Sequence, residues 1–250
     1  MAFRQGPVLN IGRFLYTSFC SASIAKACAA GLCYAVSMDR FRDRSDAGEQ
    51  LGTMLVARKF AHPLVLALPR GGVPVGFEIA KKLSCPLDTI VSRKIGAPFN
   101  PEFAVGAIAP YDVIFLDEDY STLSDSSRTA IDGVIEKERD EMRRRIGKYG
   151  SGSYSADYIP QTVVVVDDGV ATGMTARAAL KAARICYPKA RIVFASPVCI
   201  GDATEELAKE ADEIICLSSP PDFYAIGQAY EHFDQVLDEE VIRLLQKANA

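Results

Sequence analysis

Apolar residues along this chain fall into short runs, separated by stretches with helical periodicity. The clearest run is Thr162–Val166, where every side chain is β-branched and therefore favours a strand. Short runs of this kind predict strands at Leu64–Leu68, Thr89–Val91, Phe103–Ile108, Val113–Leu116, Thr162–Val166, Arg191–Ser196 and Glu213–Leu217. The third and fourth strands are separated by a short turn, which predicts an antiparallel hairpin.

Capping signals and periodicity predict helices in the segments between the strands. Ser45 or Asp46 caps the first helix, with Glu49 placed for a capping box, and Asp238 caps the last. The predicted helices end near Phe60, Leu83, Tyr149, Cys186, Glu210 and Ala248. This alternation with short links predicts an α/β fold: a mainly parallel twisted sheet with helices on both faces.

One predicted helix, residues 126–149, is long and strongly charged. Its apolar residues recur at roughly helical spacing: Ile131, Ile135, Met142 and Ile146. We expect an inserted amphipathic helix that covers the sheet edge or a partner subunit, which would suit a homodimer. The Arg143–Arg145 run within it is more typical of a solvated face than of an RNA site.

The first 37 residues differ from the rest of the chain. Residues 14–36 are mostly apolar and small, with Lys26 in their middle, and Arg4 and Arg13 precede them. Three interpretations stay open: an upstream extension outside the functional domain, a targeting segment, and a weak membrane anchor. Because a charged, helix-starting stretch begins at Met38, we expect an extension at residues 1–37 and a functional domain at residues 38–250, without stable membrane association.

Composition narrows the class of protein. The 250 residues are 49% hydrophobic and 24% charged, which argues against a disordered chain or a polytopic membrane protein. A net charge of −4 gives no global basic field, so we expect no nucleic-acid partner. Seven cysteines without a C-x-x-C pair and two histidines argue against a zinc site or a disulfide framework. They predict reduced cysteines in a cytoplasmic protein.

Two acids, Asp167 and Asp168, follow the strongest strand, and a turn of small residues then opens a helix. Ligands of open α/β sheets bind at the carboxyl ends of strands. Backbone N–H groups at a helix N-terminus can cradle a phosphate, whereas the two carboxylates suit sugar hydroxyls or Mg²⁺. A site that holds both a phosphate and a diol is typical of ribose 5-phosphate binding.

The string VVVVDDGVATGMT at residues 163–175 closely resembles the phosphoribosyl-pyrophosphate (PRPP) motif of type I phosphoribosyltransferases. From Met38 to about Lys247, the chain is similar to bacterial and archaeal members of this family whose acceptor is generally unassigned. The resemblance implies that Asp167 and Asp168 bind the ribose 2′- and 3′-hydroxyls. It implies that the 5′-phosphate is held by Ala171, Thr172, Gly173, Met174 and Thr175.

Two other strand-end segments carry cations. Gly71 and Gly72 allow positive φ or an unusual peptide geometry and a close approach to an anion, and Arg70 beside them can bind phosphate oxygens. The resemblance implies that this segment is the pyrophosphate loop. Arg93 and Lys94 are further candidate pyrophosphate ligands. The resemblance also places a mobile catalytic loop within residues 96–107, where the one acid is Glu102, a candidate for orienting the nucleophile, for reaching Mg²⁺ or for capping a turn.

A fourth segment lies near the C-terminus, at residues 220–231. The resemblance implies that Phe223, Tyr224 and Ile226 form a platform for the acceptor. It places Glu231 near Mg²⁺, together with Asp167 and Asp168. The same string could simply be part of the hydrophobic core. The small base-binding subdomain that is usual in the family is not obvious in residues 38–61.

These resemblances imply a Mg²⁺-dependent phosphoribosyltransferase that uses PRPP and a nitrogen-containing, nucleobase-like acceptor. Arg70, Lys94, Asp167 and Asp168 would be the catalytic residues, and C1′ would invert as pyrophosphate leaves. Two alternatives stay open. One is a non-catalytic regulatory protein that senses PRPP, and the other is a hydrolase that transfers the ribosyl phosphate to water.

Overall fold

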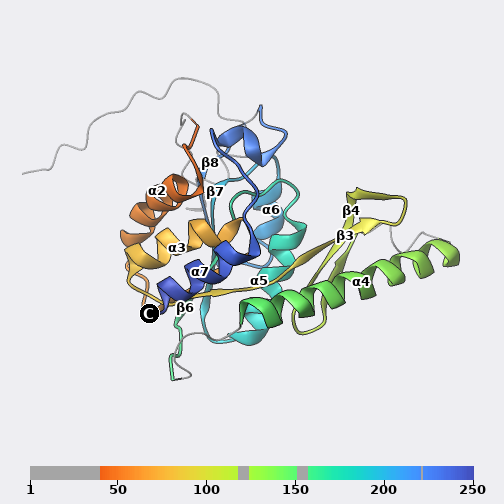
Figure 1. Ribbon diagram of the computed structural model, residues 1–250, viewed down its shortest axis with the longest axis horizontal. Helices are drawn as coiled ribbons and strands as arrows, with labels where there is room; N and C mark the ends of the chain where they lie inside the picture. Colours follow the sequence, from red (N-terminus) through yellow and green to blue (C-terminus); the bar gives the residue numbers. More distant parts are fainter. Residues whose placement is uncertain (1–39, 118–123, 151–156, 221) are drawn as a thin grey trace, which may run out of the picture.

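The computed structural model describes residues 40–117, 124–150, 157–220 and 222–250 (Figure 1). Its helices are α2 (Arg44–Val56), α3 (Gly72–Leu83), α4 (Asp125–Tyr149), α5 (Met174–Cys186), α6 (Ala203–Leu207), the 3₁₀ helix η2 (Ile226–Ala229) and α7 (Asp238–Ala248). Its strands are β1 (Pro63–Ala67), β2 (Leu87–Thr89), β3 (Arg93–Ala97), β4 (Asn100–Ala109), β5 (Val113–Leu116), β6 (Thr162–Val166), β7 (Arg191–Val198) and β8 (Glu213–Ser218). Strands and helices alternate along most of the chain, as predicted.

Five strands form one parallel sheet in the order β2-β1-β6-β7-β8. The β-branched strand β6 is at its centre, where Val165 pairs with Leu66 of β1 and with Phe194 of β7. Every residue of β6 is buried, because helices cover both faces of the sheet. The predicted parallel α/β sheet is therefore confirmed.

The two faces of the sheet are covered by different helices (Figure 1). Val164 and Val166 of β6 belong to the core cluster formed with α2, α3 and α7. Val163 and Val165 belong to the cluster on the opposite face, formed with α5 and α6. Helices thus cover both faces, and ligands of such open α/β sheets bind at the carboxyl ends of the strands.

The other three strands form an antiparallel sheet in the order β3-β4-β5. The predicted β4–β5 hairpin is confirmed, with Ile108 opposite Ile114. Residues 96–107, where a mobile catalytic loop is expected, include parts of the strand pair β3–β4, in which Lys94 lies opposite Ala107, and the mobility of this segment stays a prediction. The apolar part of β4 was predicted as the strand Phe103–Ile108, whereas β3, with the sequence Arg-Lys-Ile-Gly-Ala, has no apolar run and was not predicted.

The long helix expected at residues 126–149 is present as α4, which runs beside β3 and β4 away from the main sheet (Figure 1). Ile131, Ile135 and Met142 are buried, as their spacing predicts. The guanidinium of Arg93 in β3 lies 2.7 Å from the Glu138 carboxylate of α4. In this chain α4 covers the second sheet, and a role for it between subunits stays a prediction.

Two predicted helix caps are wrong. The N-cap of α2 is Asp43, whose carboxylate accepts the backbone N–H of Asp46 at 2.8 Å, so the helix begins before Ser45. The N-cap of α7 is Leu237, and no side chain caps that end. The Asp238 carboxylate is instead engaged by side chains of α4.

Two of the cysteines are paired with each other. Cys199 and Cys216 form a disulfide, so the prediction of reduced cysteines is wrong for this pair. The two residues lie on or beside the neighbouring strands β7 and β8, which their spacing in the sequence did not reveal.

Within the described part of the chain, no helix is both long and apolar enough to span a membrane. The interpretations of residues 1–37 lie outside the described residues.

Candidate functional site

The loops that follow β1 and β6 are packed against each other. The backbone N–H of Leu68 donates to the carbonyl of Val166 at 2.8 Å. A Cβ placed on Gly72 would lie 2.7 Å from the same carbonyl oxygen, and one placed on Gly71 would overlap the Asp168 carboxylate. The φ of Gly71 is −61°, so close approach rather than positive φ is the reason for glycine here.

The two acids after β6 are held in different ways. The Oδ1 atom of Asp167 accepts the backbone N–H of Asp168 at 2.9 Å. Loss of water around the Asp167 carboxyl and the nearby charge of Asp168 raise the pKa of Asp167 well above its usual value. The Asp168 carboxylate accepts Nε of Arg44 at 2.7 Å, and the Asp168 carbonyl accepts the Tyr230 hydroxyl at 2.5 Å. Asp168 is therefore the ion-paired member of the acid pair.

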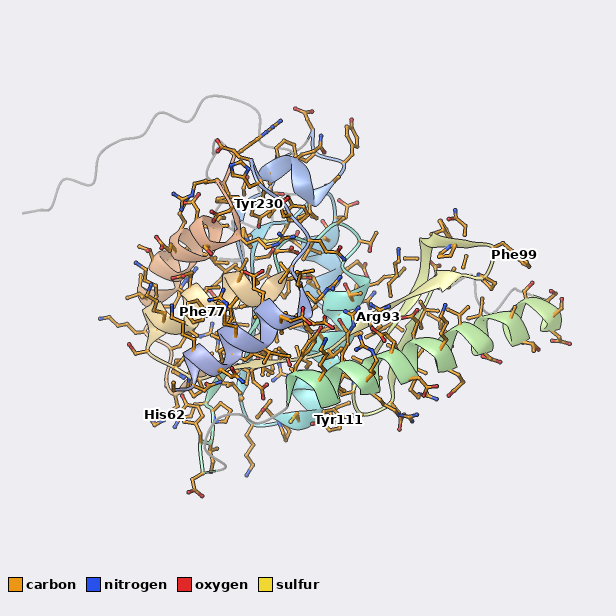
Figure 2. All side chains as sticks on the ribbon, in the orientation of Figure 1. His62, Phe77, Arg93, Phe99, Tyr111 and Tyr230 are labelled. Carbon is orange, nitrogen blue, oxygen red and sulfur yellow. A yellow bond between two sulfur atoms is a disulfide. The ribbon has the colours of Figure 1, made fainter. Side chains whose placement is uncertain are left out.

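Two distant segments of the chain, Phe41–Arg44 and Ala229–Asp234, meet beside the acid pair, and we call this region the hood. The Phe41 N–H donates to the Ala229 carbonyl, and the Glu231 N–H donates to the Phe41 carbonyl, both at 2.8 Å. The rings of Tyr230 and Phe233 stack with centroids 4.9 Å apart. Figure 2 shows Tyr230 where the first described helix meets the C-terminal segment.

The turn between β6 and α5 contains the predicted phosphate-binding residues 171–175. Its first part is fixed to β7, because the Val170 N–H donates to the Val198 carbonyl at 2.9 Å and the Val170 carbonyl accepts the Ile200 N–H at 2.8 Å. Gly173, with φ 75°, is the N-cap of α5, and no side chain caps the helix there. Glycine suits this left-handed conformation, and the N–H groups of the first helical turn can then bind an anion.

Arg70 in the loop after β1 faces the start of α7. Its Nη1 atom lies 3.6 Å from Oδ1 of Asp238, and the Pro69–Arg70 peptide is cis. The Asp238 carboxylate also accepts Lys148 Nζ and the Tyr149 hydroxyl, each at 2.8 Å. These hydrogen bonds, chiefly the one from Lys148, lower the pKa of Asp238 to about 2. Asp238 therefore links the predicted pyrophosphate loop to α4.

Arg93 and Lys94 are on β3 rather than in a loop. The Arg93 side chain is ion-paired with Glu138, so it is held toward α4. Lys94 is next along the strand and its side chain is half-buried. Adjacent side chains of a strand point to opposite faces, so the two cations are not directed to one point. Their predicted binding to pyrophosphate stays a prediction.

The three predicted acceptor-binding residues have different surroundings. Ile226 lies against the acid loop, since a Cβ on Gly169 would overlap its side chain. Phe223 is half-buried against the core, whereas Tyr224 is 88% exposed. Of the three, Ile226 is the one whose contact with the acid loop is evident.

The acids predicted to hold a metal do not form a cage by themselves. In the described ranges, no three His, Cys, Asp or Glu side chains are grouped so that they could hold a metal ion. Asp167 and Asp168 are neighbours, and Asp168 already contacts the Arg44 cation. Glu231 is exposed within the hood. A Mg²⁺ ion bound by these three side chains alone does not fit this arrangement.

Sequence reasoning missed three residues of this site: Arg44, Tyr230 and Phe233. Their strings, FRDRSD and QAYEHF, are each an unusual mixture of aromatic and charged residues. That mixture was a usable signal, but nothing in the sequence showed that the two strings pair. The contact spans 190 residues along the chain, from Arg44 to Asp234.

Comparison with known proteins identifies a family. The Phosphoribosyl transferase domain family matches residues 44–235. Two Mycobacterium tuberculosis proteins, both named "Putative phosphoribosyl transferase", are 43% identical to this chain over 215 residues, which cover 85% of this chain and 48% of theirs. The chain therefore spans about half the length of these curated relatives.

A solved structure has a similar fold. The crystal structure of TT1426 from Thermus thermophilus is 38% identical, with a TM-score of 0.68, and the match covers 85% of this chain and 100% of that one. The family match includes the loops after β1 and β6, and of the hood it includes Arg44 and Ala229–Asp234. The chain therefore belongs to the phosphoribosyl transferase domain family.

Proposed function

We propose that this chain transfers ribose 5-phosphate from PRPP to a nitrogen-containing, nucleobase-like acceptor and releases pyrophosphate. One observation supports this most directly. The loop Arg70–Gly72 and the acid pair Asp167–Asp168 are packed together at neighbouring strand ends, and the turn after the acids leads to the uncapped N-terminus of α5. PRPP has a pyrophosphate, a vicinal diol and a 5-phosphate, so each element has a matching group on the ligand.

The proposed roles follow from the chemistry of each element. The turn at residues 171–175 binds the 5-phosphate through backbone N–H groups. Asp167 and Asp168 accept hydrogen bonds from the ribose hydroxyls. Arg70 and Lys94 stabilise the negative charge that develops on pyrophosphate as its bond to C1′ breaks. The acceptor nitrogen forms the new bond to C1′ from the opposite face and loses its proton, and the electron pair of the broken bond leaves with pyrophosphate.

Mg²⁺, in this proposal, arrives on PRPP. Protein-bound Mg²⁺ commonly uses one or two carboxylates together with substrate phosphates and waters. Asp167 and Asp168 are the carboxylates of the site that could contact such an ion, whereas Glu231 is not grouped with them. When bound, the ion would add positive charge beside the leaving pyrophosphate.

Release of pyrophosphate tests the proposal. The full chain is incubated with Mg²⁺·PRPP and a panel of purine, pyrimidine and other nitrogen acceptors. We expect acceptor-dependent release, reduced at least about 100-fold by Arg70→Gln, because an electrostatic contact to the leaving group is lost. Arg243→Gln is the matched control, since Arg243 is an exposed arginine of α7, with 64% of its side chain accessible.

Two results would contradict the proposal in different ways. Pyrophosphate release that does not depend on any acceptor would indicate hydrolysis of PRPP. Binding of PRPP without release under any condition would indicate a PRPP-sensing protein. In either case the ribose-phosphate site would stand and the transferase activity would not.

A further inference from the structure

Arg44 is enclosed by contacts from three parts of the site. Its Nε atom donates to Oδ2 of Asp168 and its Nη1 atom donates to the Asp234 carbonyl, both at 2.7 Å. The guanidinium carbon lies 3.8 Å from the centroid of the Phe233 ring. Only 12% of the Arg44 side chain and 14% of the Asp168 side chain are exposed. This ion pair is fixed by its surroundings, unlike a solvated surface pair.

Arg44 occupies a position on α2 where helix formation does not require an arginine. Arg44 is the first residue of the helix, where the macrodipole disfavours a positive charge. Asp43 already caps that end through its carboxylate, so Arg44 is not needed to start α2. The contacts to Asp168, Phe233 and Asp234 therefore explain an arginine at this position better than helix formation does.

We propose that Arg44 is the resident counter-cation of the ribose-phosphate subsite, so that a phosphorylated ribose binds there without a divalent metal. The inference rests on the proposed function of this site. It assigns Arg44 a positioning role: it fixes the Asp168 carboxylate and neutralises its charge.

Electrostatics explains why the subsite needs a cation. A carboxylate close to a phosphate-binding turn repels the phosphate unless a positive charge compensates it. No group of three potential ligands that would hold a metal occurs in the described part of the chain, and the cation found at Asp168 is Arg44. Arg44 contacts Oδ2, and a carboxylate accepts hydrogen bonds at both oxygens. A ribose hydroxyl can therefore bind at Oδ1 while the ion pair stays intact.

Calorimetric titration with ribose 5-phosphate tests this role, because this ligand lacks the pyrophosphate that would bring its own Mg²⁺. The full-length wild-type chain, Arg44→Gln and Arg44→Lys are each titrated in EDTA and in Mg²⁺. Arg143→Gln is the matched control, since its side chain is 65% exposed and pairs with Asp140 at the surface of α4. A thermal melt of each variant verifies folding.

We expect wild type to bind with a Kd that differs less than about twofold between EDTA and Mg²⁺. Arg44→Gln should bind at least about tenfold more weakly in EDTA, because it leaves a carboxylate unpaired, and Mg²⁺ should restore part of the loss. Arg44→Lys should retain more affinity than Arg44→Gln, and Arg143→Gln should match wild type.

Each other outcome overturns the inference. Binding by wild type only in Mg²⁺ would show that a metal is the counter-cation, and the ribose-phosphate site would stand. Equal or tighter binding by Arg44→Gln would show that Arg44 does not support the ligand. No binding by folded wild type in either buffer would contradict the proposed site itself, and the inference with it.

Discussion

The Arg70 guanidinium lies 3.6 Å from the Asp238 carboxylate, which connects the loop after β1 to the first turn of α7. The same carboxylate accepts hydrogen bonds from Lys148 and Tyr149 at the end of α4. Three elements far apart in the sequence thus share one acid. Because Arg70 is the proposed pyrophosphate ligand, Asp238 both supports the fold and orients a residue of the site.

Replacement of Asp238 by Asn should affect both stability and the site. The amide cannot balance the charges of Arg70 and Lys148, so we expect the free energy of unfolding to fall by about 1–3 kcal/mol. Urea unfolding measures this change. Glu239→Gln, at a neighbouring position with a 78% exposed side chain, is the control and should change stability by less than about 0.5 kcal/mol. Equal effects of the two substitutions would rule out a special role for Asp238.

Lowering the pH should remove the contribution of Asp238 to the stability of the fold over a defined pH range. Its hydrogen bonds lower its pKa in the folded state to about 2, below the ordinary value of 3.8. A lowered pKa stabilises the fold above the ordinary value, and this stabilisation is lost as pH falls from about 4 to about 2. In thermal melts, the difference between wild type and Asp238→Asn should be largest above about pH 5 and nearly absent at about pH 2. A difference that does not change with pH would be inconsistent with this ion pair.

Glycines of the loop after β1 should not tolerate a side chain. Gly72→Ala would place a methyl group 2.7 Å from a backbone carbonyl of β6, which cannot move without disturbing the sheet. We expect a loss of about 1–3 kcal/mol in unfolding free energy. Gly147→Ala in α4 is the control: nothing lies within 4 Å of its added methyl, and helix propensity should stabilise the chain by up to about 1 kcal/mol. Similar losses at both positions would contradict the close approach described here.

The Tyr230 hydroxyl should contribute to the hood through the Asp168 carbonyl. Tyr230 is 3% exposed, and its phenol donates to this carbonyl at 2.5 Å. Tyr230→Phe leaves the acceptor without this donor, so we expect a loss of about 1–2 kcal/mol in urea unfolding and weaker ribose 5-phosphate binding. Tyr224→Phe, at an 88% exposed residue, should have neither effect. A neutral Tyr230→Phe variant would show that this hydrogen bond does not hold the acid loop.

The main sheet could be predicted from the sequence because its strands are buried on both faces. Runs such as Thr162–Val166 are continuous in apolar or β-branched residues for that reason. The helix at Asp125–Tyr149 was predictable because one stripe is buried and the rest is solvated. β3 was not predictable, because its sequence, Arg-Lys-Ile-Gly-Ala, has no apolar run.

The candidate site was predictable where one short string contains the chemistry. Asp167, Asp168 and the turn after them are contiguous, so both the chemistry of these residues and the family resemblance indicated the site. The partners of these residues were not predictable. Arg44 and Asp168 are 124 residues apart, and the disulfide between Cys199 and Cys216 likewise depends on which strands are neighbours. Single-sequence patterns report local burial, not long-range pairing.

Calorimetric titration of the full chain with Mg²⁺·PRPP tests the central claim, a PRPP site built on the acid pair, most directly. The comparison is between wild type, the double variant Asp167→Asn and Asp168→Asn, and a control, Glu205→Gln, on α6. We expect wild type and the control to bind alike and the double variant to lose at least about 100-fold in affinity, since hydrogen bonds to two ribose hydroxyls are weakened. A folded wild-type protein that does not bind Mg²⁺·PRPP, or a double variant that binds as tightly as wild type, would contradict the account.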